Sequence, residues 1–309
     1  WNRLPYADSV DVDFDPARVA GQATARLRIE WPRVNGVAAD AINVTGHVET
    51  QGFASTQPMF GHLVKNGGVS IAIDGSEAHI TGKADVDGAP ADLDLHLPLD
   101  GTGVAKTAVK LVLDDAARKA LGVDLGPFLS GPVTATVEST GTAKDVQAVT
   151  IDLAKAVIRL QPAGFAKPAG KPGKLMFKLQ RSADGGVRIS DLVLKAGTAS
   201  FEGDIALDGD GLVSADLPRG AIVDGDHFAT KVTRVGKGFR IAISGSAFDG
   251  QGLVNTLLRS TTGASFAVGR PLSISAAIDN VTGFNGEVLS GVNLSTELGD
   301  SGLRALSMT

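Results

Sequence analysis

The sequence predicts an all-β protein: a long, curved antiparallel meander sheet that forms an apolar groove, with two short helices. Three features of the 309 residues carry this prediction. Apolar and polar residues alternate with a period of two along much of the chain, tight-turn dipeptides separate the alternating segments, and few segments have helical periodicity. Residues 91–99 illustrate the alternation, since their odd positions are Ala or Leu and their even positions are Asp, His or Pro.

The alternating segments follow one another along the whole chain. The segment at 23–31 sets Ala, Leu, Ile and Trp against Thr, Arg and Glu. The others lie, in chain order, at 91–99, 133–138, 174–180, 201–208, 239–243, 272–278 and 292–298. At the spacing of about 8–12 residues that is typical of all-β proteins, the pattern predicts roughly eighteen strands.

Turn signals lie between these segments. Asn-Gly and Asp-Gly pairs favour two-residue hairpins because both central residues of the turn need a positive φ. They occur within 66–68, 87–88, 184–186, 208–211, 224–225 and 285–286. Successive strands are therefore predicted to be antiparallel neighbours in an up-and-down meander.

Two segments are predicted to be helical. In LDDAARKALG, an Asp at 114 or 115 is the expected N-cap and Gly122 is the expected C-terminal stop. The second helix is expected near 249–260, where it would cap one end of the sheet. Its apolar stripe consists of Leu253, Val254, Leu257 and Leu258.

The segment QPAGFAKPAGKPGK, residues 161–174, is rich in Pro, Gly and Lys and is predicted to be a loop or linker. It separates residues 1–160, the N-terminal part of the predicted groove, from residues 175–309, its C-terminal part with the short helix near 249–260. The sequence leaves open whether these two parts share one sheet.

Composition excludes several classes of function. The chain has no cysteine, so it has no disulfide framework, zinc–thiolate site, iron–sulfur cluster or cysteine nucleophile. Its net charge is −5 and its Lys and Arg residues are scattered, so no nucleic-acid partner is expected. No run of about 18 apolar residues is present, so no transmembrane helix is predicted.

Catalytic motifs are missing as well. The chain contains no GxSxG, P-loop or HExxH pattern, and no pair of carboxylates stands out as an acid–base pair. His96 lies on the polar side of its strand and is interpreted as a solvated histidine. We therefore expect no enzyme activity, no catalytic residues, no cofactor and no metal site.

The predicted strands have more apolar faces than two short helices can cover. The faces could pack on each other in a dry sandwich or solenoid, which would be a structural or adhesive envelope protein, or they could stay open and bind acyl chains. In the second case the inward side chains of the strands would solvate the lipid. These candidates are Leu93, Leu95, Leu97, Val109, Leu111, Leu113, Val133, Val137, Ile151, Leu153, Phe177, Phe201, Ile205, Ile241, Ile243, Ile274 and Ile278.

Four segments resemble the AsmA-like proteins of Gram-negative envelopes, with the YhdP- and TamB-type members as the most similar branch. They are residues 80–99, 111–137, 244–258 and 271–308. The shared motifs are a G-x-A-x-x-x-G-x-P-A hairpin, a short Asp-capped helix before GPFLSGPV, and a helix that begins with Phe-Asp.

The resemblance implies a repeating β-groove that conducts phospholipids passively between the inner and outer membranes. It also implies a periplasmic location, with an inner-membrane anchor outside this chain, and the chain would then be a C-terminal portion of a longer protein. Phospholipid or another acyl-chain lipid is the expected partner, with membrane at the ends of the full-length protein.

Overall fold

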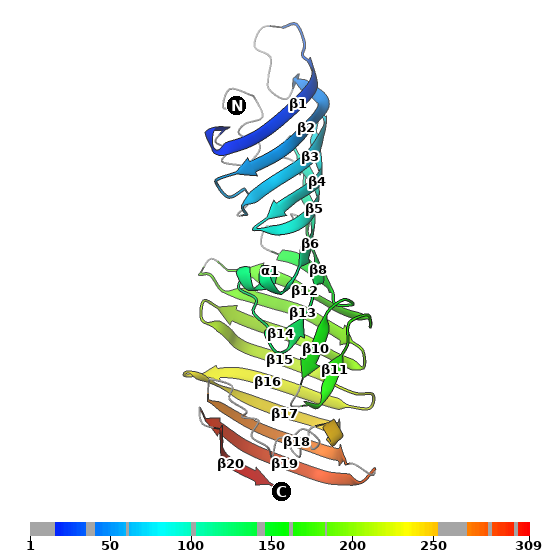
Figure 1. The fold of residues 1–309 in the computed structure, drawn as a ribbon, viewed down its shortest axis with the longest axis vertical. Helices are drawn as coiled ribbons and strands as arrows, with labels where there is room; N and C mark the ends of the chain where they lie inside the picture. Colours follow the sequence, from blue (N-terminus) through cyan, green and yellow to red (C-terminus); the bar gives the residue numbers. More distant parts are fainter. Residues whose placement is uncertain are drawn as a thin grey trace. The chain divides into compact units, whose positions relative to one another are not determined.

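The structure is a computed structural model that describes residues 16–34, 41–59, 62–99, 103–140, 146–160, 163–182, 184–252, 271–283, 286–299 and 302–309. Strands dominate these residues, so the predicted all-β class is confirmed. The chain divides into two compact units: unit 1 contains residues 1–124 and 134–147, and unit 2 contains residues 125–133 and 148–309. Figure 1 shows the strands of each unit following one another in chain order.

Unit 1 contains a meander of long strands. Each strand from β1 to β6 pairs antiparallel with the next along the chain. The strands are β1 (Val19–Glu30), β2 (Asn43–Ser55), β3 (Val64–Asp74), β4 (Glu77–Val86), β5 (Ala89–Pro98), β6 (Lys106–Leu113) and β8 (Val133–Thr140). A 3-10 turn, η1 (Pro16–Arg18), precedes β1.

Unit 2 contains a second meander and a small three-stranded sheet. The meander strands are β12 (Gly173–Arg181), β13 (Val187–Ala196), β14 (Ala199–Asp208), β15 (Gly211–Ala221), β16 (His227–Val235), β17 (Gly238–Asp249), β18 (Leu272–Thr282), β19 (Val288–Gly299) and β20 (Gly302–Met308). β9 (Val146–Asp152) pairs with β12. The small sheet consists of β7 (Leu129–Ser130), β10 (Val157–Leu160) and β11 (Phe165–Lys167), all antiparallel.

Among the strand pairs whose register the structure describes, one is parallel and not antiparallel as predicted. β17 and β18 are parallel, with Ile241 opposite Ile274. Parallel neighbours need a crossover connection of a dozen or more residues, and residues 250–271 supply that length. The sequence indicated no hairpin turn between these strands, but the alternation within them is the same for either direction.

Helix α1 (Asp115–Ala120) forms where the sequence predicted it. Asp114 is the N-cap, and its side chain accepts a hydrogen bond of 2.8 Å from the Ala117 N–H. Gly122 follows the helix with φ +79°, a backbone conformation that favours glycine at a helix end. Of the second predicted helix, at 249–260, the structure describes the end of β17 and two helical residues at 251–252, and residues 253–260 lie outside the described ranges.

The turn signals have two different outcomes. Asp87 and Gly88 both have positive φ, +50° and +84°, and join β4 to β5 in the predicted two-residue hairpin. Asn66, in contrast, has φ +52° inside β3, where the pairing with β4 shifts register between Lys65 and Gly68. The Asn-Gly-Gly segment therefore makes a β-bulge, which needs the same backbone conformation as a turn.

The segment predicted as a loop at 161–174 contains β11, and β12 begins within it at Gly173. The boundaries of the compact units lie at 124–125, 133–134 and 147–148. Gly164 and Gly170 of this segment do lie in turns, and residues 169–171 form the bend between β11 and β12. β11 is only three residues long, which is too short for a period of two to be visible in the sequence.

Asp87 gives the hairpin of β4 and β5 a pH-dependent stability. His62 Nδ1 lies 2.7 Å from one carboxylate oxygen of Asp87, and the Leu63 N–H donates to the other at 2.9 Å. The hydrogen bond from His62 is the largest cause, and it lowers the pKa of Asp87 below its ordinary value. Burial is the second-largest cause and raises the pKa, while the Leu63 N–H and the charge of His62 add to the lowering. A depressed carboxyl pKa stabilises the folded state above the unfolded pKa, and that contribution is lost as the pH falls through the folded pKa.

We expect Asp87→Asn to lower the free energy of unfolding at pH 7 by under about 1 kcal/mol, because the pair is at the surface. Asn accepts the positive φ of this turn, so the substitution tests the charge alone. Urea unfolding of both proteins at pH 7 and at about pH 3 measures the effect. The difference between the two proteins should shrink as the pH falls toward about 3, and a constant difference at both values would contradict the electrostatic explanation.

Candidate functional site

The candidate site is the apolar face of each meander. In unit 1, side chains that lie opposite each other on neighbouring strands form rows across the sheet, because paired residues share a face. One row consists of Ala25, Val48, Ile71, Ile80, Leu95 and Thr107. The next row contains Val69, Gly82, Leu93 and Val109. The predicted candidates on β5 and β6 therefore share one face.

Unit 2 repeats this arrangement over a longer run of strands. One row consists of Leu179, Ile189, Ile205, Ala215, Val232, Ile241, Ile274 and Thr296. A second row consists of Leu175, Leu194, Phe201, Gly220, Phe228, Gly245, Ile278 and Val292. Phe177 alternates with Leu175 and Leu179 along β12 and is likewise half-buried.

Most of the predicted lipid-binding side chains are only half-buried. Four of the candidates are buried by protein atoms: Leu113, Val133, Leu153 and Ile278. The others keep part of their surface accessible: Leu93, Leu95, Leu97, Val109, Leu111, Val137, Ile151, Phe177, Phe201, Ile205, Ile241, Ile243 and Ile274. Large apolar side chains in a closed core are usually buried, so these faces have apolar surface to offer to a ligand.

Large apolar side chains are strongly exposed on β1, at one edge of the unit 1 meander. Leu27 and Ile29 lie on the apolar face, opposite Gly46 and Val44, and are 51% and 49% exposed. Trp31, which follows the strand, is 60% exposed. The sequence analysis found this alternation but did not include these three residues among the lipid-binding candidates.

Aromatic rings cluster on the apolar face of unit 2. The ring of Phe228 packs edge to face against Phe201 and Phe248, with centroid distances of 6.0 and 5.8 Å. Gly220 lies beneath two of the rings, where a Cβ would come within 2.8 Å of Phe228 and 3.2 Å of Phe201. Of the three rings, the sequence analysis selected only that of Phe201, although Phe228 begins an alternating segment.

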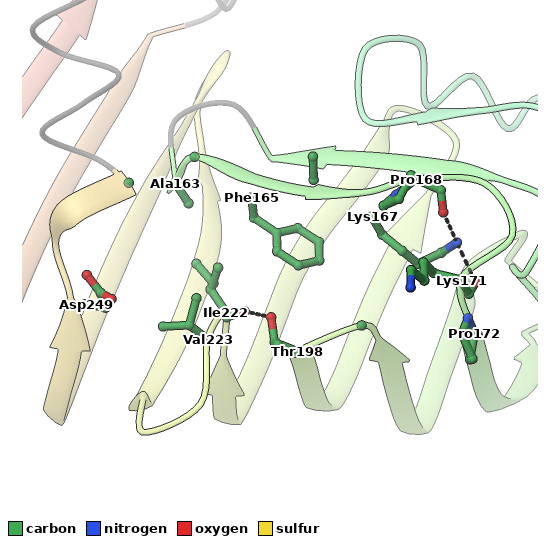
Figure 2. Close-up of a pocket in the computed structure, with 14 residues that line it drawn as sticks. Ala163, Phe165, Lys167, Pro168, Lys171, Pro172, Thr198, Ile222, Val223 and Asp249 are labelled. Carbon is green, nitrogen blue, oxygen red and sulfur yellow. Dashed lines mark hydrogen bonds between the residues drawn. The ribbon is translucent and has the colours of Figure 1, made fainter.

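A pocket of about 430 Å³ lies in unit 2 between the small sheet and the turns of the meander. Figure 2 shows Phe165 of β11 pointing toward Thr198, Ile222 and Val223, which lie at the ends of meander strands. The Thr198 hydroxyl donates to the Ile222 carbonyl at 2.8 Å, which joins two of these turns. The small sheet therefore covers part of the apolar edge of unit 2.

Lys167, in the wall of this pocket, is 1% exposed. Its Nζ donates to the carbonyl oxygens of Ala156, Lys171 and Pro168 at 2.8, 3.0 and 3.1 Å. Figure 2 shows the bonds to Lys171 and Pro168. Burial lowers the pKa of Lys167, and the charge of Asp152 opposes that effect in part. Because its three protons are directed at carbonyls, Lys167 has a structural role in holding the chain from 156 to 171 together.

Asp226 is a second buried charged residue that sequence reasoning missed. One of its carboxylate oxygens accepts from the N–H groups of Ile222 and Val223 at 3.0 and 3.1 Å, and the other accepts from the Asp249 N–H at 2.7 Å. It therefore fixes the turn between β15 and β16 to the end of β17. The sequence showed only an Asp-Gly turn signal beside it, at 224–225.

Neither membrane-spanning helices in the described part of the chain nor known relatives were found. Among the residues that the structure describes, no helix has the length and apolar character needed to cross a membrane. Searches against protein-family models, curated proteins and solved structures gave no match to this chain.

Proposed function

We propose that the protein binds acyl-chain lipid on its apolar sheet faces and passes phospholipid between the inner and outer membranes across the periplasm. The observation that supports this proposal is the half-buried state of the apolar rows. A row such as the one through Leu95 crosses several strands and ends in the exposed residues of β1. A surface of this kind matches the length and chemistry of an acyl chain better than it matches a compact polar substrate.

The energetics favour a passive role. Moving one CH₂ group from an apolar surface into water costs about 0.8 kcal/mol, so an acyl chain of about fourteen such groups faces a barrier near 11 kcal/mol. A continuous apolar face lowers this barrier without a reactive group. The residues proposed to contact the chain are the half-buried candidates of the two meanders, and the proposal assigns none of them a catalytic role.

The first test is native mass spectrometry of freshly purified protein, combined with solvent extraction. We expect phospholipid to copurify at one or more copies per chain. A protein that carries no extractable lipid and takes up none from vesicles would contradict the proposal and favour a dry, structural β-protein.

Two substitutions locate the bound lipid. Leu95→Asp in unit 1 and Ile243→Asp in unit 2 place a charge on the apolar faces and should abolish lipid retention. Because both side chains are only partly buried, each substitution should cost only about 1 kcal/mol, which lowers the melting temperature by about 2–4 °C. The matched controls are Val112→Asp and Ser244→Asp, which place the same charge at exposed positions on the other face of β6 and β17.

The controls should retain both lipid and stability. Wholesale unfolding of Leu95→Asp and Ile243→Asp would mean that these side chains belong to a packed core, because an unpaired buried charge is costly. That result would reject the proposed function.

A further inference from the structure

The polar face of unit 1 carries a second group of side chains with its own chemistry. His79 on β4 and His96 on β5 lie directly opposite each other, at equal distances from the Asp87-Gly88 turn. Asp94 precedes His96 by two residues and therefore shares its face of the strand. Three side chains that could bind a metal ion are thus brought together by one hairpin.

The geometry of these side chains is close to that of a ligand set. The imidazole rings of His79 and His96 stack with a centroid distance of 3.9 Å and an interplanar angle of 17°. One carboxylate oxygen of Asp94 lies 2.7 Å from Nε2 of His79 and 3.6 Å from Nε2 of His96. One ligand atom from each residue lies within 4.8 Å of the other two.

These separations suit a first-row transition metal. With metal–ligand bonds of about 2.0–2.2 Å, the ligand atoms of a tetrahedral ion lie roughly 3.4 Å apart. The two distances to Asp94 lie on either side of that value. All three side chains are partly exposed, so small rotations can close the set.

A second carboxylate orients one of the rings. Glu77 Oε1 lies 2.5 Å from Nδ1 of His96, and Nε2 of the same ring faces Asp94. Such a carboxylate–histidine contact fixes the ring orientation and raises the basicity of the nitrogen that binds a metal. Glu77 and His96 also line a pocket of about 390 Å³, on the Nδ1 side of the His96 ring.

We propose that His79, Asp94 and His96 bind one divalent transition-metal ion such as Zn²⁺, with Glu77 as the orienting residue. Two imidazoles and one carboxylate are ligands that Zn²⁺ accepts, whereas Ca²⁺ and Mg²⁺ prefer oxygen ligands alone. The bound ion would join β4 to β5 on the face opposite the apolar rows. This proposal does not depend on lipid binding.

Calorimetric titration of the metal-free 309-residue chain with Zn²⁺ tests the site. We expect one ion per chain, and a melting temperature that rises with the Zn²⁺ concentration because the ion binds the folded state. His79→Ala and His96→Ala each remove a ligand and should weaken binding by more than tenfold. Glu77→Gln removes only the orienting carboxylate and should weaken binding by about tenfold.

His47→Ala is the matched control. His47 lies on the same polar face and is hydrogen-bonded to Glu49 on its own strand, outside the cluster. It should leave the affinity unchanged. The proposal would be overturned if the wild-type chain bound no Zn²⁺, or if it bound Zn²⁺ with the same affinity and stoichiometry as His79→Ala.

A further variant separates the loss of a metal ligand from a loss of folding. His96→Gln keeps a polar side chain beside Glu77, and its melting temperature without metal should equal that of the wild type. If that variant folds normally and still binds Zn²⁺ at full affinity, His96 is not a ligand and the site as proposed is wrong.

Discussion

Gly203→Val is expected to destabilise the protein by about 3–5 kcal/mol. Gly203 lies in β14 with φ +152°, a conformation that L side chains rarely adopt. A Cβ built there would overlap the carbonyl oxygen of Asp216 and lie 2.8 Å from Cα of Leu217. Backbone strain and overpacking each cost about 1–3 kcal/mol, and here both apply.

The expected loss of stability in Gly203→Val has the opposite sign to the change that intrinsic strand propensity predicts. Valine favours strands and glycine weakens them, so propensity alone would predict a gain in stability. The register between β14 and β15 shifts once across Gly203: Glu202 pairs with Arg219, whereas Asp204 pairs with Asp216. The missing side chain allows the irregular backbone of β15 to approach β14.

The measurement is chemical unfolding of Gly203→Val beside Gly209→Ala. Gly209 lies in the next turn, with open space where a Cβ would be and no positive φ. Its substitution should be neutral or stabilise by up to about 1 kcal/mol, because it reduces the freedom of the unfolded chain. Equal stabilities for the two variants would show that the close approach at Gly203 is not required.

Unit 1 has a counterpart of this glycine. Gly82 in β4 has φ +149°, and a Cβ there would overlap the carbonyl oxygen of Gly68 and lie 2.7 Å from Cα of Val69. Both glycines lie five residues before an Asp-Gly pair, at 87–88 and 208–209. The two meanders therefore share a structural device with a sequence signature, although the surrounding residues differ.

Lys167→Met is expected to destabilise the protein by about 2–4 kcal/mol. Methionine keeps most of the volume of the lysine but removes the three donors to the carbonyls of Ala156, Lys171 and Pro168. These carbonyls would lose their partner in a place where the lysine is 1% exposed, and an unsatisfied buried polar group costs about 1–3 kcal/mol. Packing by the methionine side chain offsets part of the loss.

The control for this prediction is Lys174→Met, on the exposed side of β12. It should change the free energy of unfolding by no more than about 0.5 kcal/mol. Thermal and urea unfolding of both variants provide the comparison. A Lys167→Met protein as stable as the wild type would mean that water replaces the ammonium group and that the three hydrogen bonds are dispensable.

The predictions for Gly203 and Lys167 concern the structure that supports the proposed lipid surface. Gly203 shapes the meander whose face carries Phe201 and Ile205, and Lys167 holds together the chain from 156 to 171, which contains β10 and β11 of the small sheet. Loss of lipid in either variant would follow from loss of structure. The charged substitutions at Leu95 and Ile243 are the ones that separate binding from folding.

Local sequence features predicted much of the secondary structure. The alternation at 91–99 predicted β5 and its apolar face, Asp87-Gly88 predicted the hairpin before it, and Asp114 predicted the start of α1. Each of these depends on interactions within a few residues. A period of two, a positive φ and an N-cap are therefore visible in the sequence alone.

The pairing of His79 with His96 could also have been predicted from the sequence, because both lie the same number of residues from the turn at 87–88. A two-residue hairpin at 87–88 pairs these residues, and Asp94 then joins them on the same face. The sequence analysis treated His96 alone and interpreted it as solvated. The signal was present, but it lay in the register of the hairpin and in no contiguous motif.

Other features depend on contacts between distant residues, and only the tertiary structure decided them. The parallel direction of β17 and β18 could not be predicted, because alternation is identical in parallel and antiparallel strands. Lys167 is buried where three carbonyls from two bends, at 154–156 and 168–172, converge on it. The sequence by itself determined which side chains share an apolar face. How much of that face stays exposed depends on which segments fold back over it, and that is a property of long-range packing.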